Sequence, residues 1–185
     1  MNGRTPPQLS PRTAAALMIL GATLLAGCTV PEEPATVTSS APPVTEAPAP
    51  VAESFRKYDA LRSELIAALE TKMPGISWTV ERPATLATLD DGTCMLYPAT
   101  MKSSADVVEP SHRFTDIFAA GDPVLKRHGF PAFDGTDPVP GGWMVTRSAD
   151  AAGATLTIES KSPAYLRLSV PVDSPTCSAG EIPPG

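Results

Sequence analysis

The sequence has almost no carboxamide side chains, because its 185 residues contain only Asn2 and Gln8 of this kind. Beyond residue 8 this absence excludes N-glycosylation sequons and removes side chains that often contact sugars. A compositional bias of the source genome would produce the same absence. The lack of carboxamides therefore does not define a ligand by itself.

Motifs of catalysis and cofactor binding are also missing. The chain has no GxSxG, no HExxH, no glycine-rich phosphate loop and no Rossmann fingerprint. It has two histidines, His112 and His128, for which a helix cap or a partner of a helix dipole is the more ordinary role. Asp134 and Asp137 are more typical of a turn than of a calcium loop. We predict no catalytic residue, no metal site and no cofactor.

The amino-terminal segment is typical of a lipoprotein signal peptide. Residues 1–13 carry Arg4 and Arg12 without an acid, and residues 14–26 form an apolar run too short to span a membrane. The run ends in Leu25-Ala26-Gly27-Cys28, a lipobox, so we predict cleavage after residue 27 and lipidation of Cys28. An ordinary secretory signal with a chance cysteine is the alternative. The predicted location is the outer face of the cell membrane, with the lipid as anchor.

Net charge argues against nucleic acid as a partner. Removing Arg4 and Arg12 leaves 12 basic against 20 acidic side chains, a net charge of −8. Nucleic acids and anionic membrane surfaces both attract clusters of Lys and Arg. We therefore expect another envelope protein or ligand as partner, of unknown identity.

A proline-rich segment follows the predicted lipidation site. Residues 29–50 hold six prolines and no aromatic residue, so with Cys28 we interpret residues 28–50 as a disordered tether. As a polyproline helix this tether reaches up to about 70 Å. Its hydroxyl side chains are candidates for O-glycosylation, and a bare linker is an equal alternative.

Two cysteines remain after lipidation of Cys28. In an exported protein, Cys94 and Cys177 most simply form one disulfide. A metal pair or a reactive thiol is the alternative, but no CxxC motif or nearby histidine favours a metal.

Hydrophobic periodicity predicts one folded domain over residues 51–180 and a loose tail over residues 181–185. A helix is expected over residues 53–73, with its apolar stripe on Tyr58, Leu61, Leu65, Leu69 and Met73. Strands are expected around residues 76–81 and at Thr93–Ala99. A second helix is expected over residues 111–128, with a kink or restart at Pro123. Alternation then predicts strands at Gly142–Ser148, Ala154–Ser160 and Ala164–Val172.

The order α-β-β-α-β-β-β predicts an α+β fold. We expect a two-layer sandwich, with an antiparallel sheet of about five strands and both helices on one face. The long connections are Pro98–Pro110 and Gly129–Gly141. Because binding function concentrates on loops, exposed Phe130 and Phe133 in the second are a candidate partner surface. Trp78 and Trp143 are more often core residues than groove residues at such positions.

The order of these features resembles the LppA-like lipoproteins of mycobacteria and related actinobacteria. The resemblance rests on the lipobox, the tether, the segment Met73-Pro74-Gly75-Ile76-Ser77-Trp78, the two cysteines and the sequence His128-Gly129-Phe130. It covers about residues 55–180, and Pro123 departs from a continuous second helix. The family implies a two-layer α/β domain, a disulfide and envelope anchoring, with no established enzymatic activity.

The sequence therefore predicts a membrane-anchored envelope lipoprotein that acts as a non-enzymatic binding module. Two alternatives remain open. One is a small envelope hydrolase that uses His112 or His128 with a carboxylate. The other is a lipid carrier, although a domain with one sheet must fill its own core.

Overall fold

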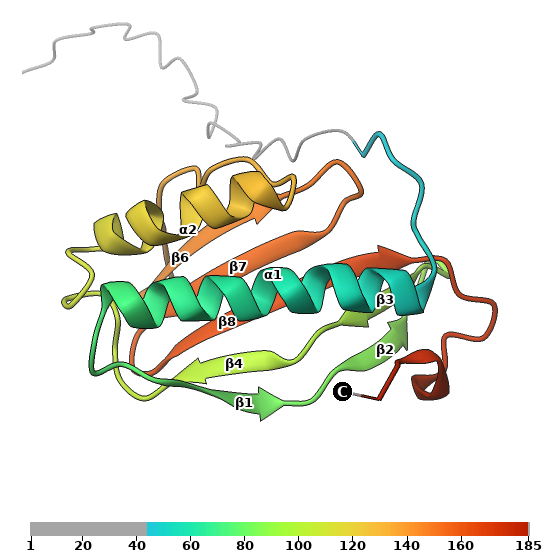
Figure 1. Cartoon of the computed structure of the whole chain (residues 1–185), viewed down its shortest axis with the longest axis horizontal. Helices are drawn as coiled ribbons and strands as arrows, with labels where there is room; N and C mark the ends of the chain where they lie inside the picture. Colours follow the sequence, from blue (N-terminus) through green and yellow to red (C-terminus); the bar gives the residue numbers. More distant parts are fainter. Residues whose placement is uncertain (1–43, 185) are drawn as a thin grey trace, which may run out of the picture. The chain divides into compact units, whose positions relative to one another are not determined.

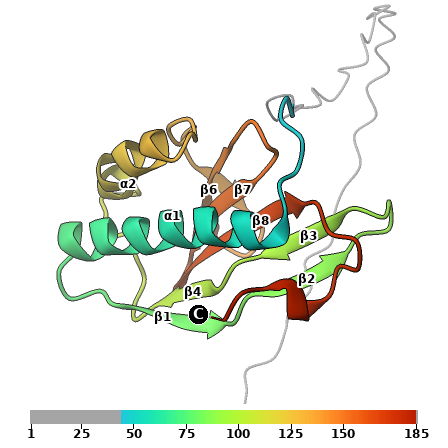
Figure 2. The ribbon, with the colours of Figure 1, turned by 45° about the vertical axis from the view of Figure 1, so that its right-hand side comes forward.

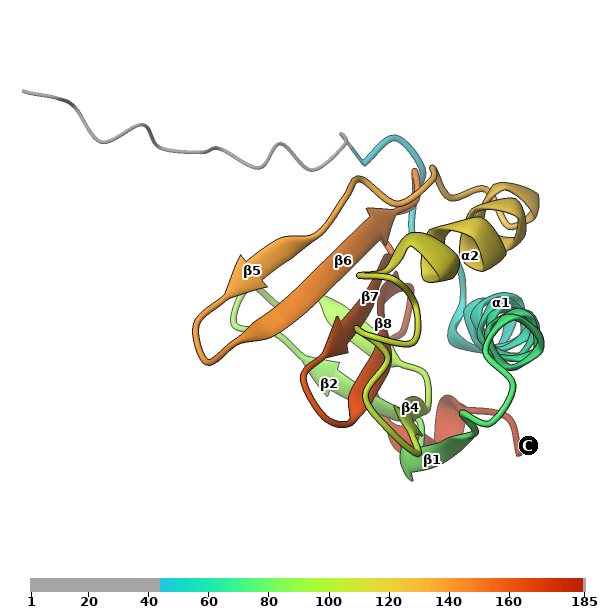
Figure 3. The same ribbon diagram turned by 90° about the vertical axis from the view of Figure 1, so that its left-hand side faces the viewer.

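The computed structural model describes residues 44–184, which form an α+β domain of two layers (Figure 1). An antiparallel sheet forms one layer, and both α-helices lie on the same face of it (Figure 3). Cys28 and the tether residues up to 43 lie outside the described residues. In chain order the elements are α1 (Val51–Lys72), β1 (Trp78–Arg82), β2 (Thr85–Thr88), β3 (Cys94–Tyr97), β4 (Thr100–Ser103), α2 (Thr115–Arg127), β5 (Asp137–Val139), β6 (Trp143–Ala149), β7 (Thr155–Ser160), β8 (Ala164–Val172) and a 3-10 turn (Ala179–Glu181).

Helix α1 runs along the sheet and buries the stripe that its periodicity predicts. Leu61, Leu65 and Leu69 are completely buried, and Tyr58 and Met73 are nearly so. Their three- and four-residue spacing places them on one side of the helix, toward β8. The helix ends before Pro74-Gly75, where Gly75 adopts a left-handed φ of 101°.

The sheet has eight strands rather than about five. Its main path is β1-β4-β8-β7-β6-β5, while β2 pairs with β3 and β3 pairs with β8. The extra strands arise mainly because two long strands are each interrupted at a proline. Pro83 separates β1 from β2, and Pro98 separates β3 from β4, so that the halves follow one another along the sheet (Figure 2). The α+β class with two helices is confirmed, and the strand number is corrected.

The two long connections also contain strands that the sequence does not reveal. The connection Pro98–Pro110 contains β4, and the connection Gly129–Gly141 contains β5. These strands are only three or four residues long, too short to show a clear alternation.

Helix α2 begins at Thr115 rather than near residue 111. The preceding residues His112, Arg113 and Phe114 all have left-handed φ angles, so they cannot belong to a right-handed helix. Pro123 lies inside α2, which continues through it as one helix, so the restart, one of the two expected outcomes, does not occur. The Asp122 carboxylate, directly before this proline, accepts a hydrogen bond from the Phe133 amide at 3.1 Å.

Both ends of the described chain are fastened to the domain. Cys94 in β3 forms the predicted disulfide with Cys177, with a Cα–Cα distance of 5.6 Å. Residues 44–50, which the sequence assigns to the tether, lie along the domain edge. There the Thr45 amide donates to the carbonyl of Ala151, and the Asp173 amide donates to that of Ala49, both at 2.9 Å.

Candidate functional site

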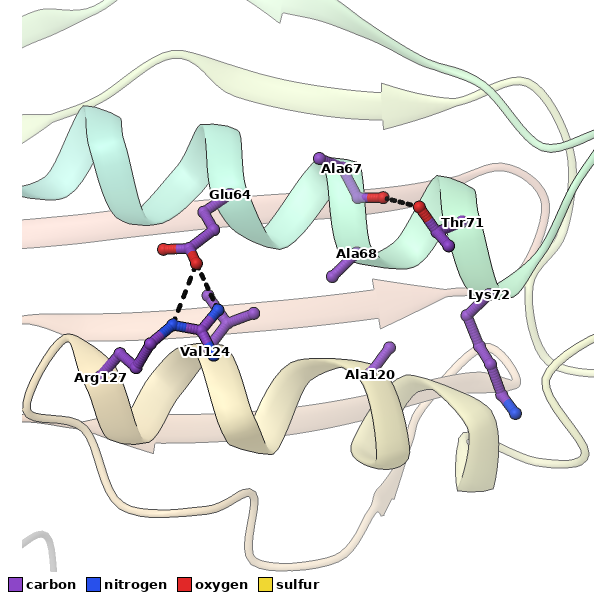
Figure 4. A pocket seen from close by; sticks show the side chains of 8 residues that line it. All are labelled: Glu64, Ala67, Ala68, Thr71, Lys72, Ala120, Val124 and Arg127. Atoms are coloured by element: carbon purple, nitrogen blue, oxygen red, sulfur yellow. Dashed lines mark hydrogen bonds and ion pairs between the residues drawn. The ribbon is translucent and has the colours of Figure 1, made fainter.

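A groove of about 500 Å³ runs between the outer sides of α1 and α2 (Figure 4). Short side chains line it on both helices, Ala67 and Ala68 on α1 and Ala120 and Val124 on α2, and Ala68 points toward Ala120 (Figure 4). Short side chains at facing positions leave space that larger ones would fill. Between its ends the groove is therefore mostly apolar, with Thr71 as the one hydroxyl among its described lining residues, and its charges lie at Glu64 and Arg127 on one side and Lys72 on the other.

Each end of this groove carries one of the two histidines in an ion-pair cluster. At one end Glu64 accepts from His128 Nε2 at 2.7 Å and from Arg127 Nε at 3.0 Å. Hydrogen bonds first from His128 and then from Arg127 lower the pKa of Glu64. These contacts join the end of α2 to the middle of α1.

At the other end Asp116 accepts from His112 Nδ1 at 2.8 Å and pairs with Lys72 Nζ at 3.2 Å. Hydrogen bonds from His112 and then Lys72 lower the pKa of Asp116. Both histidines are thus brought to a carboxylate, but within residues 44–184 neither ring hydrogen-bonds to a hydroxyl or a thiol. In this arrangement the clusters fasten α1 to α2.

The prediction of a partner surface at Phe130 and Phe133 is wrong, because only 3% and 9% of these residues is exposed. Phe130 packs edge-on against Tyr58, with ring centroids 6.2 Å apart, and Phe133 packs against Phe118 at 5.6 Å. The connection turns its aromatic side chains inward because it closes the core between α2 and the sheet. A loop that completes a core cannot offer those side chains to a partner.

The opposite face of the sheet has no helix over it among residues 44–184 (Figure 3). Alternation along β8 turns Leu166 and Leu168 into the core and places Tyr165 and Arg167 on this open face. Trp143 of β6 lies beside Tyr165, with ring centroids 6.2 Å apart. The two tryptophans therefore differ, since Trp78 is a core residue and Trp143 is half-buried on the open face.

Two adjoining hollows lie on this open face, and they share Arg82, Thr100 and Arg167. The smaller one measures about 210 Å³ and also contains Trp143, Tyr165 and two carboxylates, those of Glu81 and Glu159. The larger one, which we call the sheet hollow, measures about 710 Å³. It is lined by Arg82, Pro83, Thr85, Ala87, Tyr97, Pro98, Thr100, Arg167 and Leu168.

Among residues 44–184, ion pairs fix most of the charges of this face but leave Arg82 without an ion-pair partner. Arg167 pairs with Glu159, and its guanidinium carbon lies 5.0 Å from the centre of the Tyr165 ring. Lys102 pairs with Glu81 at 3.5 Å. Arg82 forms no ion pair with any residue in the described part of the chain, although it is exposed beside the hollow.

Sequence reasoning overlooks Arg82, Tyr165 and Arg167 as site residues. The available signal was the outward half of the β8 alternation, where a tyrosine and an arginine stand between buried leucines. Arg82 gives no such signal, because its proximity to Arg167 depends on β1 pairing with β4 and β4 with β8.

Between residues 44 and 184, no group of three or more His, Cys, Asp or Glu side chains is arranged to hold a metal ion. No helix in that range is long and apolar enough to cross a membrane. Compared with known proteins, the chain matches no family model, no curated protein and no solved structure. The resemblance to the LppA-like lipoproteins therefore stays a prediction.

Proposed function

We propose that this protein is a lipid-anchored, non-enzymatic binding module of the cell envelope, related to the LppA-like lipoproteins. Acylated Cys28 would hold it on the outer face of the membrane, and the open sheet face would meet the ligand or partner. The observation that supports this proposal is the hollowed sheet face, where Arg82, Arg167 and Tyr97 line a space of about 710 Å³ and the rings of Trp143 and Tyr165 line the adjoining hollow. Concave sites with a few placed polar groups are typical of ligand binding.

The anchor is tested by expressing the full chain and its Cys28→Ala variant in a bacterium that processes lipoproteins. We expect the unmodified chain in the detergent phase after detergent phase separation, because two acyl chains hold a protein stably in a membrane. The variant should move to the aqueous phase or retain its uncleaved leader. Mass spectrometry should find diacylglycerol on Cys28. An unmodified Cys28 in the mature protein would contradict the anchor.

The binding face is tested by NMR with the ¹⁵N-labelled full chain in neutral detergent. Titration with a soluble extract of the bacterial envelope should shift the amides of Thr157 and Arg167 on the open face. The amides of Ala67 and Thr71 in the helix groove serve as the matched control. Shifts confined to the helix groove would place binding on the other face, and no shifts at all would contradict the binding module.

The hydrolase remains the second candidate, because each histidine lies within 2.8 Å of a carboxylate. The variants His112→Ala and His128→Ala separate the two functions. A binding module should keep its titration shifts in both variants. A hydrolase would lose turnover of its substrate in one of them while its fold, measured by circular dichroism, stays intact.

A further inference from the structure

The sheet hollow lies where the hairpin of β1–β2 with β3–β4 opens, next to the bulge between Val80 and Arg82. Arg82 pairs with Thr100 on one side of the opening and Thr85 with Tyr97 on the other, in the same register. Pro83 lies in the gap on one strand and Pro98 on the other. Because proline has no amide hydrogen, neither can donate to a ladder bond there, and the two strands separate.

The neighbouring strand β8 separates from this hairpin at the same place. Strand β4 pairs with β8 at Met101 and Leu166, and β3 pairs with β8 at Leu96 and Val170. Between these two pairs, residues 97–100 lie opposite residues 167–169 and form no ladder pairs with them. Four residues thus face three, as in a β-bulge. Bulges occur preferentially beside functional sites, where they redirect side chains.

The charge of this opening contrasts with that of the chain. The protein has a net charge of −6, yet the described residues that line the sheet hollow include Arg82 and Arg167 and no carboxylate, while Glu81 and Glu159 line the adjoining hollow. The Glu159 ion pair and the Tyr165 ring fix Arg167 in place, while Arg82 has no ion-pair partner among residues 44–184. Two guanidinium groups at one concave site favour an anion with several oxygens.

The remaining polar groups in the sheet hollow are the hydroxyls of Thr85, Thr100 and Tyr97. With no Asn or Gln beyond residue 8, these hydroxyls, the backbone and the guanidinium groups of Arg82 and Arg167 are the groups that can hydrogen-bond to neutral oxygens there. We propose that the sheet hollow binds a phosphate ester of a small sugar or polyol, with the phosphate between Arg82 and Arg167. A phosphate offers three terminal oxygens to the two guanidinium groups, whereas a carboxylate offers two. This inference rests on the proposed function as a binding module.

The test is a titration of the full chain in neutral detergent with glucose 6-phosphate, followed by calorimetry and by amide shifts. Glucose, glucuronate and inorganic phosphate are the comparison ligands. The variants are Arg82→Gln and Arg167→Gln. The matched control is Arg147→Gln, because Arg147 lies on the same face, pairs with Asp137 at 3.0 Å and lines neither hollow.

We expect glucose 6-phosphate to bind and to shift the amide of Arg167. Glucose should not bind, and glucuronate and inorganic phosphate should bind more weakly. Arg82→Gln and Arg167→Gln should each lower the affinity for glucose 6-phosphate about tenfold or more, which is the usual effect of losing a charge-assisted hydrogen bond. The Arg147→Gln variant should bind the ester with the affinity of the wild type.

If the Arg82→Gln and Arg167→Gln variants bind glucose 6-phosphate as tightly as the wild type does, the proposed site is wrong. If the wild type binds glucuronate or inorganic phosphate as tightly as glucose 6-phosphate, the proposed ligand class is wrong. If no phosphate ester binds but the envelope extract still shifts the open face, the ligand class is wrong and the binding module stands. If neither binds, both proposals fail.

Discussion

At the scale of single residues, the turn before α2 carries the most unusual backbone of the domain. His112, Arg113 and Phe114 have φ angles of 50°, 57° and 74°, a region that costs a residue with a side chain about 1–2 kcal/mol. The fully buried Phe114 ring and the Ser111 hydroxyl, which accepts from the Phe114 amide at 2.9 Å, hold the turn in place. The surrounding contacts thus compensate for the local backbone cost.

Replacing Arg113 with glycine should raise the free energy of unfolding by about 0.5 kcal/mol. Glycine adopts the left-handed region freely, and this relief of about 1–2 kcal/mol exceeds its greater loss of chain entropy of about 0.5–1 kcal/mol. Urea denaturation measures the change. As a control, Lys126→Gly in the right-handed part of α2 should lower stability by about 1 kcal/mol. Equal destabilisation by both substitutions would contradict the left-handed turn.

At the scale of elements, α2 packs through a glycine. A Cβ at Gly121 would lie 2.8 Å from Cε2 of Phe133 and 3.3 Å from Cδ1 of Leu65. Glycine inside a helix normally costs about 1 kcal/mol relative to alanine. Here it makes room for the Phe133 ring between α2 and the core.

The substitution Gly121→Ala should therefore destabilise the protein, against its helix propensity. We expect the free energy of unfolding to fall by about 1 kcal/mol, because the cost of overpacking a filled site exceeds the gain in helix propensity from glycine to alanine. Thermal and urea denaturation both report this change. In a Phe133→Leu background the same substitution should be neutral or stabilising, and a stabilising effect in the natural background would refute the close contact.

The ion pairs between α1 and α2 make the helix layer sensitive to acid. The pKa of Glu64 lies below its ordinary value of 4.5, so the folded protein binds this proton less readily than the unfolded chain does. The stabilisation is therefore complete above pH 4.5 and is lost as the pH falls through the lower folded-state pKa.

Glu64→Gln should accordingly flatten the dependence of the melting temperature on pH below 4.5, because glutamine does not titrate. Calorimetric scans between about pH 3 and pH 7 measure this slope. Asp116→Asn should act in the same direction, because His112 and Lys72 lower the pKa of Asp116 in the same way. Parallel curves for the wild type and both variants would show that these pairs do not contribute.

The elements that sequence predicts well are the long periodic ones. The stripe of α1 and the alternation of β7 and β8 extend over enough residues to identify their buried faces. The strands β2, β4 and β5 have three or four residues each, and their place depends on partners far along the chain. At Val80 the alternation of the strand also fails to predict burial. The bulge between Val80 and Arg82 turns this apolar side chain away from the core and leaves the residue 56% exposed.

The candidate site was less predictable than the fold for a related reason. The sheet hollow joins Arg82 of β1, Tyr97 of β3 and Arg167 of β8, which no local pattern connects. The prolines Pro83 and Pro98 are visible in the sequence, but their meeting across one hairpin requires the register. Local cues located Phe130 and Phe133 in a loop and could not show that the loop turns inward.

At the scale of the whole molecule, the disulfide closes most of the domain into one loop. The sequence separation of Cys94 and Cys177 is 83 residues, for which chain-entropy estimates give a stabilisation of about 4 kcal/mol. The stabilisation arises because the crosslink restricts the unfolded chain.

Reduction, or the double substitution of Cys94 and Cys177 with serine, should lower the free energy of unfolding by about 4 kcal/mol. The midpoint of urea denaturation, measured with and without reductant, reports the loss. A Cys28→Ser variant is the control, since its response to reductant should equal that of the wild type. Unchanged stability on reduction would show that the crosslink contributes nothing.

The same crosslink also determines how the protein responds to a protease. Helix α2, the turn before it and the connection that holds Phe130 all lie between the two bonded cysteines. A single cut at any peptide bond between residues 94 and 177 leaves both fragments covalently joined, with β3 still linked to the carboxyl-terminal turn. Under non-reducing conditions a nicked molecule would gain only the mass of one water, and its two fragments would separate only after reduction.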